Sequence, residues 1–353
     1  FLQGTHSVKL VVIDNDGESD TSVTTVTRTM FRKNVNGQVV AGLSLIGSNI
    51  LYAIVNGDAI YRMDNDGNID YTLQVGGNLL ASSSIANDST VYIGSTDNNI
   101  YAFSKNGTSL WVKALGGAVT TTPTVDILND RVYVGVLNRN FQFIDRSTGN
   151  VLGNYFSDSP INTSAVITSD DKLFFSTSNG TMYGFDLASI SFPNVTPTWI
   201  INSSDMISSS PAIDSEGFFY VGTSNGLLKK ISMQPELQGT VVWTANLGGS
   251  IIASPVIDAT GNIYVGSSND NFYSVDRMNG SIEWSYSFGG QIKTTATISN
   301  DANIYFGTSN GYIYCIDTLG TTLWQYEDSS SICSSLLYSD GVLYLGTLDG
   351  RLV

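Results

Sequence analysis

Residues that could do chemistry are few in this chain of 353 residues, and they form no recognisable catalytic pattern. The single histidine is His6, near the start of the sequence. A Ser-His-Asp or Cys-His relay needs an imidazole beside its nucleophile, so the sequence beyond His6 cannot hold one. No His or Cys residues have the spacing of a zinc site, and no glycine-rich loop precedes a helical pattern, as a phosphate-binding loop requires. The sequence therefore predicts no catalytic residue, no metal site and no cofactor.

Two acidic stretches have the composition of calcium loops, namely residues 64–70 (DNDGNID) and 14–17 (DNDG). An EF-hand loop has Gly at the sixth position after an initial Asp, and counting back from Gly67 places Arg62 at that start. Asp, Asn and Gly are also the residues that form turns. We interpret both stretches as hairpin turns, with weak calcium sites as the alternative. No pair of carboxylates suited to glycoside hydrolysis stands out.

Cysteines and glycosylation sequons leave alternatives open. Cys315 and Cys333 are the only cysteines, and two cysteines do not make a disulfide framework. They are interpreted as small core residues, with one bridge between neighbouring strands as the alternative. Seven Asn-x-Ser/Thr sequons would accept glycans where the host attaches them. The possible glycosylation sites are Asn87, Asn106, Asn162, Asn179, Asn194, Asn202 and Asn279.

The composition restricts the class of partner. Hydrophobic residues make up 42% of the chain, enough for a sizeable core, and no run of 18 apolar residues predicts a membrane span. The formal net charge is −15, and the 16 basic residues form no run longer than two. Nucleic-acid binders need clustered Lys and Arg to neutralise phosphates, so a nucleic-acid partner is not expected. A strongly acidic chain suits an extracellular or cell-surface location.

The elements that must position any site come from a repeat. An apolar residue, then Tyr or Phe, any residue and usually Gly recurs with spacings of 40, 41, 41, 46, 44, 41 and 39 residues. Eight copies at this spacing indicate repeated structural units. The repeated aromatic residues are Tyr52, Tyr92, Tyr133, Phe174, Tyr220, Tyr264, Tyr305 and Tyr344.

Each unit contains four short apolar runs separated by Gly- and Asn-rich turns. In the clearest copy the predicted strands cover residues 251–257, 262–267, 271–276 and 281–287, with Pro255 near the middle of the first. Four antiparallel strands per unit of about 40 residues are typical of a β-propeller blade. The predicted fold is therefore all-β: an eight-bladed β-propeller of four-stranded antiparallel blades, with seven blades as the alternative.

The last unit ends midway through its third strand. Residues 31–45 (FRKNVNGQVVAGLSL) match residues 243–257 (WTANLGGSIIASPVI) position for position. We expect the N-terminal strand to complete the last blade, which closes the ring and removes a free sheet edge.

A tryptophan runs in phase with the repeat, 19 to 25 residues after the aromatic residue in five units. Phe31 and Tyr71 occupy this position in two more units, and Gly153 departs from the pattern.

Two units are also longer, at residues 187–198 and 232–240. Insertions in repeat proteins often form binding loops, and a neutral variation in length is the alternative.

The segment from the third to the fourth strand resembles the pyrroloquinoline-quinone-type (PQQ-type) repeat, with an Asp, a turn that contains Gly, and then Trp. It reads Asp276, Gly280, Trp284 in one unit, and residues 102–111 (AFSKNGTSLW) give another copy. The resemblance covers about residues 30–353. It implies that the tryptophans lie between neighbouring blades as structural, blade-docking residues. They are Trp111, Trp199, Trp243, Trp284 and Trp324.

The PQQ-type resemblance also implies two kinds of function. Such repeats occur in scaffolds without a quinone, including a bacterial outer-membrane-assembly lipoprotein. Quinoprotein alcohol dehydrogenases are longer and carry two adjacent cysteines and a calcium ion. Here no two cysteines are adjacent, and basic residues for the quinone carboxylates are sparse. We therefore expect a non-catalytic chain.

The N-terminal residues resemble a different family. Residues 6–27 (HSVKLVVIDNDGESDTSVTTVT) are similar to the last two strands of a polycystic-kidney-disease (PKD) domain, an Ig-like β-sandwich. The resemblance divides the chain into residues 1–28, the hairpin of such a domain, and residues 29–353, the propeller. It also implies that the rest of the sandwich precedes Phe1.

These observations favour an extracellular or cell-surface binding or scaffolding module. Its partner would be a protein or a glycan at a propeller face, or further copies of the chain. The alternatives are a structural subunit of a surface layer or filament, and a PQQ-dependent dehydrogenase.

Overall fold

Short strands and turns make up the molecule, which we describe from a computed structural model. It covers residues 6–13, 19–26, 33–35, 37–39, 41–46, 50–54, 57–64, 67–233, 239–339 and 341–353. These residues form 34 strands and no helix. None of them, accordingly, lies in a helix long and apolar enough to cross a membrane.

Seven four-stranded sheets account for most of the described residues, and every strand pairs antiparallel with its sequence neighbours. The first four sheets are β4 (Ser44–Ile46), β5 (Ile50–Ile54), β6 (Ala59–Met63), β7 (Ile69–Gln74); β8 (Ser84–Ile85), β9 (Val91–Gly94), β10 (Asn99–Phe103), β11 (Ser109–Ala114); β12 (Thr124–Asp126), β13 (Arg131–Gly135), β14 (Asn140–Asp145), β15 (Val151–Phe156); and β16 (Val166–Ile167), β17 (Lys172–Ser176), β18 (Thr181–Asp186), β19 (Trp199–Asn202). The other three are β20 (Ala212–Ile213), β21 (Phe218–Gly222), β22 (Leu227–Ser232), β23 (Val241–Asn246); β24 (Val256–Ile257), β25 (Ile263–Gly266), β26 (Asn271–Val275), β27 (Ile282–Ser287); and β28 (Thr297–Ile298), β29 (Ile304–Gly307), β30 (Tyr312–Ile316), β31 (Thr322–Glu327).

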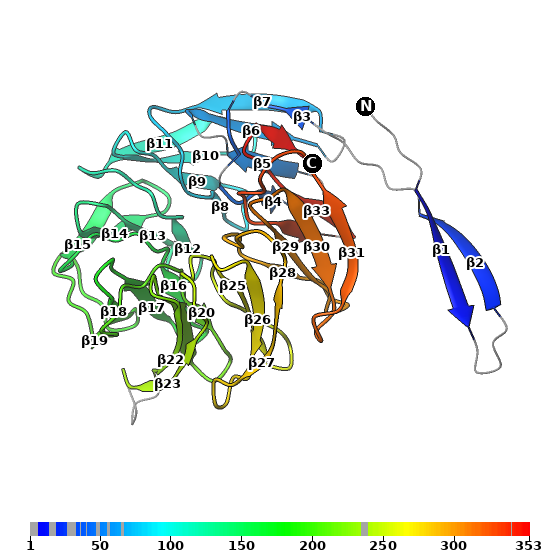
Figure 1. Ribbon diagram of the computed structural model, residues 1–353. Coiled ribbons are helices and arrows are strands. Elements are labelled where there is room, and N and C mark those ends of the chain that lie inside the picture. Colours follow the sequence, from blue (N-terminus) through cyan, green and yellow to red (C-terminus); the bar gives the residue numbers. More distant parts are fainter. Residues whose placement is uncertain are drawn as a thin grey trace.

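The sheets stand around a common axis, with the first strand of each innermost (Figure 1). Inner strands of neighbouring sheets contact one another, as in the pairs β4 with β8 and β12 with β16. This arrangement is a β-propeller, as the repeat predicts.

The two ends of the chain close the ring. β32 (Leu337–Ser339) pairs with β33 (Val342–Tyr344), and β34 (Arg351–Leu352) pairs antiparallel with β3 (Lys33–Asn34). A bridge between Gly346 and Leu352 joins the two pairs. Closure by the N-terminal and C-terminal strands is therefore confirmed, and Phe31 lies outside the described residues. The eight repeats fit the seven sheets and this closing group, but the count of eight blades stays a prediction.

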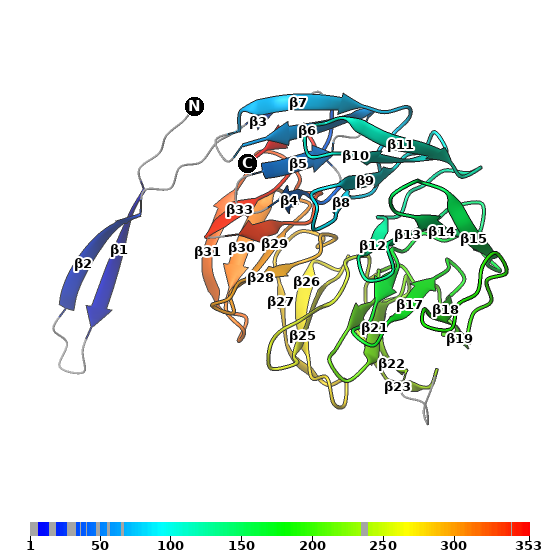
Figure 2. The ribbon, with the colours of Figure 1, turned by 180° about the vertical axis from the view of Figure 1, so that it is seen from behind.

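A two-stranded hairpin lies outside the ring in both views (Figures 1 and 2). It consists of β1 (His6–Ile13) and β2 (Ser19–Val26), which pair antiparallel with each other. These strands match the two that the sequence predicts here. The division at residue 28 and the PKD assignment stay predictions.

The core lies between the faces of neighbouring sheets. Strands β9, β25 and β29 are buried along their whole length, because a sheet covers each of their two faces. This double burial explains why they read VYIG, IYVG and IYFG, as continuous apolar runs instead of an alternating pattern.

The first strand of each sheet is shorter than predicted. The prediction of residues 251–257 is wrong at its start, since β24 covers only Val256–Ile257. Residues before it cross from the outer edge of one sheet to the inner edge of the next, where Ile251 N–H donates to Thr223 O at 3.1 Å. Pro255 has no N–H to add to a ladder.

Small polar side chains join the sheets near the axis. Thr122 N–H donates to Ser164 Oγ at 3.0 Å, and Ser164 N–H donates to Ser210 Oγ at 3.2 Å. Further along the ring, Ser254 N–H donates to Thr295 Oγ1 at 3.2 Å. Each bond crosses from one sheet to the next and satisfies a backbone N–H that no strand partner reaches.

The glycine that ends the repeated motif makes room for the next sheet. A Cβ on Gly266 would lie 2.2 Å from Cγ2 of Ile292, in the connection to the following sheet. Ile292 is fully buried. A side chain at this position would therefore force neighbouring sheets apart.

We expect Gly266→Ala to lower the free energy of unfolding by about 1–3 kcal/mol, the usual cost of overpacking a core. Urea denaturation measures this change. In an Ile292→Ala background, which removes the clashing methyl group, the same substitution should cost much less. Equal costs in both backgrounds would contradict the explanation.

Candidate functional site

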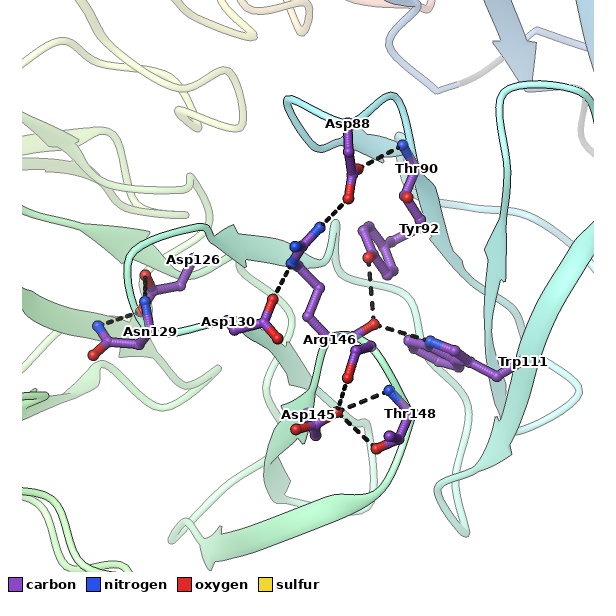
Figure 3. Close-up of polar contacts among 11 residues, drawn as sticks. Asp88, Thr90, Tyr92, Trp111, Asp126, Asn129, Asp130, Asp145, Arg146 and Thr148 are labelled. Carbon is purple, nitrogen blue, oxygen red and sulfur yellow. Dashed lines mark hydrogen bonds and ion pairs between the residues drawn. The ribbon is translucent and has the colours of Figure 1, made fainter.

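The junction between neighbouring sheets contains the residues that the repeat predicts. Trp111, in β11, donates its indole N–H to the carbonyl of Arg146 at 3.0 Å, in the turn between β14 and β15 of the next sheet (Figure 3). The hydroxyl of Tyr92 points to the same carbonyl at 3.4 Å. The ring centroids of Tyr92 and Trp111 are 5.8 Å apart. One sheet thus contacts the turn of its neighbour through two aromatic side chains.

The turn itself is held by an aspartate and a glycine. The Asp145 carboxylate accepts bonds from Thr148 N–H at 2.8 Å and Thr148 Oγ1 at 2.7 Å. Gly149 has a φ of 72°, and a Cβ there would lie 2.7 Å from the ring of Trp111. The Asp therefore shapes the turn, while the Gly lets it lie flat on the indole of the preceding sheet.

The same contact recurs at other junctions. Trp243 donates to the carbonyl of Arg277 and Trp284 to that of Thr318, both at 3.0 Å. Tyr71 replaces Trp in its sheet, and its hydroxyl donates to Lys105 O at 2.8 Å. The spacing of Asp, Gly and Trp in the sequence is thus the spacing of a contact between sheets.

The remaining two tryptophans pack on aromatic residues of their own sheets. Trp199 stacks on Phe174 with centroids 5.6 Å apart, and Trp324 lies 5.9 Å from Tyr305. The blade-docking role of all five tryptophans stays a prediction that mutation can test.

The Arg146 side chain adds an ionic contact at the same junction. Its NH1 lies 2.6 Å from Asp88 Oδ2 of the preceding sheet, and its Nε lies 2.6 Å from Asp130 Oδ1 of its own sheet. Arg277 repeats this contact with Glu216 of the preceding sheet at 2.9 Å. The guanidinium fits such a role because its donors point in several fixed directions.

Three aspartates that sequence reasoning missed bind the repeated tyrosines. The hydroxyls of Tyr133 and Tyr220 each donate at 2.7 Å, to Asp126 and Asp214. Tyr264 donates to Asp258 at 2.9 Å. Burial and the adjacent carboxylate raise the pKa of each of these three tyrosines. An Asp six or seven residues before the Tyr in three units is the sequence signal that could have revealed them.

At Gly153, where the repeat lacks its Trp, residues of the next sheet fill the space. The 187–198 insertion folds back so that a Cβ on Gly153 would lie 2.8 Å from the ring of Phe192. Phe192 also packs edge-on against Phe143, at 5.8 Å between centroids. Asn154 and Asn194 form a bridge beside it. This insertion supplies an aromatic ring where its neighbour lacks the Trp, which neither interpretation of the insertions foresaw.

A pocket of about 150 Å³ lies at the junction between the β16–β19 and β20–β23 sheets. Here the second insertion starts, and residues 234–238 lie outside the described part. The lining residues are Thr168, Asp170, Lys172, Phe174, Glu216, Gly217 and Met233.

In the acidic stretch at residues 64–70, of which residues 65 and 66 lie outside the described part, Asp64 bonds to Gly67 and Asn68 as in a turn. Asp64 accepts bonds from Asn68 N–H at 2.8 Å and Asn68 Nδ2 at 2.9 Å, so both its carboxylate oxygens are used locally. The stretch at residues 14–17 lies outside the described residues. Among the residues that are described, no group of three or more His, Cys, Asp or Glu could hold a metal ion.

No disulfide joins Cys315 and Cys333, so the alternative of a bridge is wrong. Cys315 is buried in β30, and Cys333 Sγ donates to Val39 O at 3.1 Å. Burial raises the pKa of the Cys333 thiol to about 11.

All seven sequon asparagines are exposed. Asn179 alone of them donates its side-chain amide to a carboxylate, Asp158, at 2.8 Å. A glycan on that nitrogen would compete with this bond. Glycosylation stays a prediction at all seven positions.

Comparison with known proteins places the chain in a family. Two overlapping stretches, residues 11–234 and 225–353, match the family model described as outer membrane protein assembly factor BamB. Together they cover nearly the whole chain. The chain belongs to the BamB family. The PQQ-type resemblance is therefore confirmed, and the match includes part of the N-terminal hairpin.

Solved structures agree with this fold. BamB from Moraxella catarrhalis superposes with a TM-score of 0.76 at 15% identity, over 92% of this chain and 98% of that one. The computationally designed protein Ika8 gives a TM-score of 0.77 at 15% identity, over 91% of this chain and 96% of that one. At this identity the likeness shows the fold alone. No curated protein matches the chain in sequence.

We expect Trp111→Phe to lower the free energy of unfolding by about 1 kcal/mol, because the ring remains but the Arg146 carbonyl loses its donor. Trp111→Ala should cost about 3–5 kcal/mol, since the ring is lost as well. Urea denaturation measures both. Equal stability of the Phe variant and the wild type would show that the indole N–H contributes nothing to docking.

Stability should also fall in acid. Hydrogen bonds from Thr148 and Ser147 lower the pKa of Asp145, and at Asp88 the bonds from Arg146 and Thr90 outweigh an opposing effect of burial. Carboxylates with lowered pKa stabilise the fold above their ordinary pKa of 3.8, and this stability is lost as the pH falls through their folded values. Urea midpoints should therefore drop below about pH 4, and Asp145→Asn should flatten the drop. A midpoint independent of pH in this range would contradict the assignment.

Proposed function

We propose that this chain is a non-catalytic scaffold that binds a partner protein. The observation that carries the proposal is that the repeated residues make structural contacts. Trp, Asp, Gly and Tyr of the motif make contacts within or between sheets, as at Trp111 with Arg146. The loops at the two ends of the sheets and the outer strands are then available for binding.

The outer strands offer apolar contacts to such a partner. Phe156 at the end of β15 and Ile200 in β19 are exposed to 62% and 61%. Exposed apolar side chains of this size supply area that a partner protein can bury. The family name, outer membrane protein assembly factor, supports a protein partner, although a glycan is the alternative.

An extracellular or cell-surface location accompanies this proposal. It rests on the net charge of −15 and the seven sequons, and the family description names a factor of outer membrane protein assembly. The alternative of a PQQ-dependent dehydrogenase has weaker support. Cys315 and Cys333 are not adjacent, whereas the resemblance to quinoprotein dehydrogenases implies two adjacent cysteines.

A second candidate is self-association through the hairpin. β1 and β2 pair only with each other in the described sheets, and a lone two-stranded hairpin is marginally stable in water. Pairing with a sheet edge of another copy would stabilise it. This is the structural-subunit alternative.

Photo-crosslinking in the native host can distinguish these functions. A benzophenone amino acid is placed singly at Leu128, Leu80 or Ile200, which are exposed to 89%, 45% and 61%. Leu128 follows an inner strand and Leu80 precedes one, so they sample opposite ends of the sheets, whereas Ile200 samples the outer edge. We expect a discrete adduct with a second protein from at least one of these positions and from fewer than all three.

Other outcomes would favour the alternatives. Adducts between copies of the chain alone, lost on deleting residues 1–26, would replace the scaffold with self-association. No adduct at any position, together with dye-linked turnover in the presence of added quinone and Ca²⁺, would overturn the non-catalytic proposal.

A further inference from the structure

The pocket beside Met233 lies where two other junctions hold an arginine side chain. Register defines the equivalent positions. Arg146, Met233 and Arg277 each lie three residues beyond the third-strand residue that pairs with the Trp position. Met233 is therefore the counterpart of the two arginines that bind the preceding sheet.

The acidic partner of this arginine is present at all three junctions. Asp88, Asp170 and Glu216 each come directly before the residue of positive φ in the first hairpin of their sheets. Asp88 pairs with Arg146 and Glu216 with Arg277. Asp170 faces the position of Met233, which has no charge to offer it.

The consequence is a pocket of about 150 Å³ with the chemistry of an arginine site. Phe174 and Met233 give it an apolar wall that suits the stem of the side chain. Asp170 and Glu216 supply two carboxylates, and Lys172 supplies one ammonium group, 2.5 Å from Asp170. The Asp170 side chain is still 60% exposed, so a second cation can reach it.

The chain has no cation of its own to place there from the adjoining loop. Residues 234–238, outside the described part, read QPELQ and include neither Arg nor Lys. The next sheet already uses Arg277 for Glu216. An arginine at this junction would have to come from another molecule.

We propose that this pocket binds an arginine side chain of a partner protein, which completes the junction as Arg146 and Arg277 do within the chain. This inference rests on the proposed scaffold function and names the chemistry that its partner presents. The guanidinium would pair with Asp170 beside Lys172, as that of Arg146 pairs with Asp88 of the preceding sheet. Its stem would lie along Phe174 and Met233.

Nuclear magnetic resonance of the tryptophan side chains tests the pocket directly. Nα-acetyl-arginine methylamide is titrated into the full chain labelled with ¹⁵N at its five indoles. Trp199 is the reporter, because it stacks on Phe174 and has the Lys172 ammonium 5.6 Å from its ring. We expect the Trp199 signal to shift and saturate while that of Trp111 stays in place. The citrulline analogue, which has the same shape without the charge, should give no shift.

Variants separate the pocket from a general effect of charge. Met233→Arg should fill the pocket from within and weaken probe binding by about tenfold or more. Thr318→Arg adds the same charge at the equivalent position of another junction and should leave binding unchanged. Equal shifts with the citrulline analogue, no Trp199 shift with the arginine probe, or full binding to Met233→Arg would each overturn the proposal.

The crosslinking experiment distinguishes this inference from the scaffold function. If the partner adduct persists at wild-type yield in Met233→Arg, the chain binds a partner without using this pocket. If no partner adduct forms with the wild type, the scaffold function itself fails, whatever the probe does.

Discussion

The contact between neighbouring sheets is the constraint on which this propeller depends. Strands such as β9 and β25 are buried on both faces, so a sheet taken alone would expose most of its apolar surface to water. Each sheet is therefore stable only when both of its neighbours are in place, and the two termini must meet to complete the ring. The pairing of β3 with β34 meets this requirement with backbone hydrogen bonds between residues at opposite ends of the sequence.

The repeated residues are those that make this contact between sheets possible. An indole reaches a turn carbonyl of the next sheet, as between Trp111 and Arg146, and a glycine in the same turn lets the indole lie against the backbone. A second glycine, such as Gly266, admits the branched side chain that precedes the next inner strand. Because every unit faces the same geometric problem, the same residue types recur at the same spacing. Catalysis or ligand binding would not require such repetition.

This origin of the motif also explains what the sequence could predict. The strands, the closure of the ring and the phase of the tryptophans follow from comparing the units with one another. The bond of Tyr133 to Asp126 was missed, since the units vary in which residue accepts from the tyrosine. The filling of the Gly153 position by Phe192 was also missed, because it joins two departures from the pattern in different units. A contact between two residues that both break the repeat depends on how far a loop folds back. The spacing of the motif does not encode this.

Departures from the repeat are therefore where function in this chain should be sought. Two junctions lack a residue that the repeat supplies elsewhere, and only one of them replaces it. At Gly153 the missing ring is replaced by Phe192 of the same chain, so the departure is compensated and the surface is closed. At Met233 no arginine side chain among the described residues reaches the junction, Lys172 alone pairs with Asp170, and a pocket beside this exposed carboxylate remains. Residues of two packed sheets line that pocket, so most of its wall is in place before a partner binds. An arginine from another protein would therefore enter a site already formed, which is the condition under which one side chain contributes most to specificity.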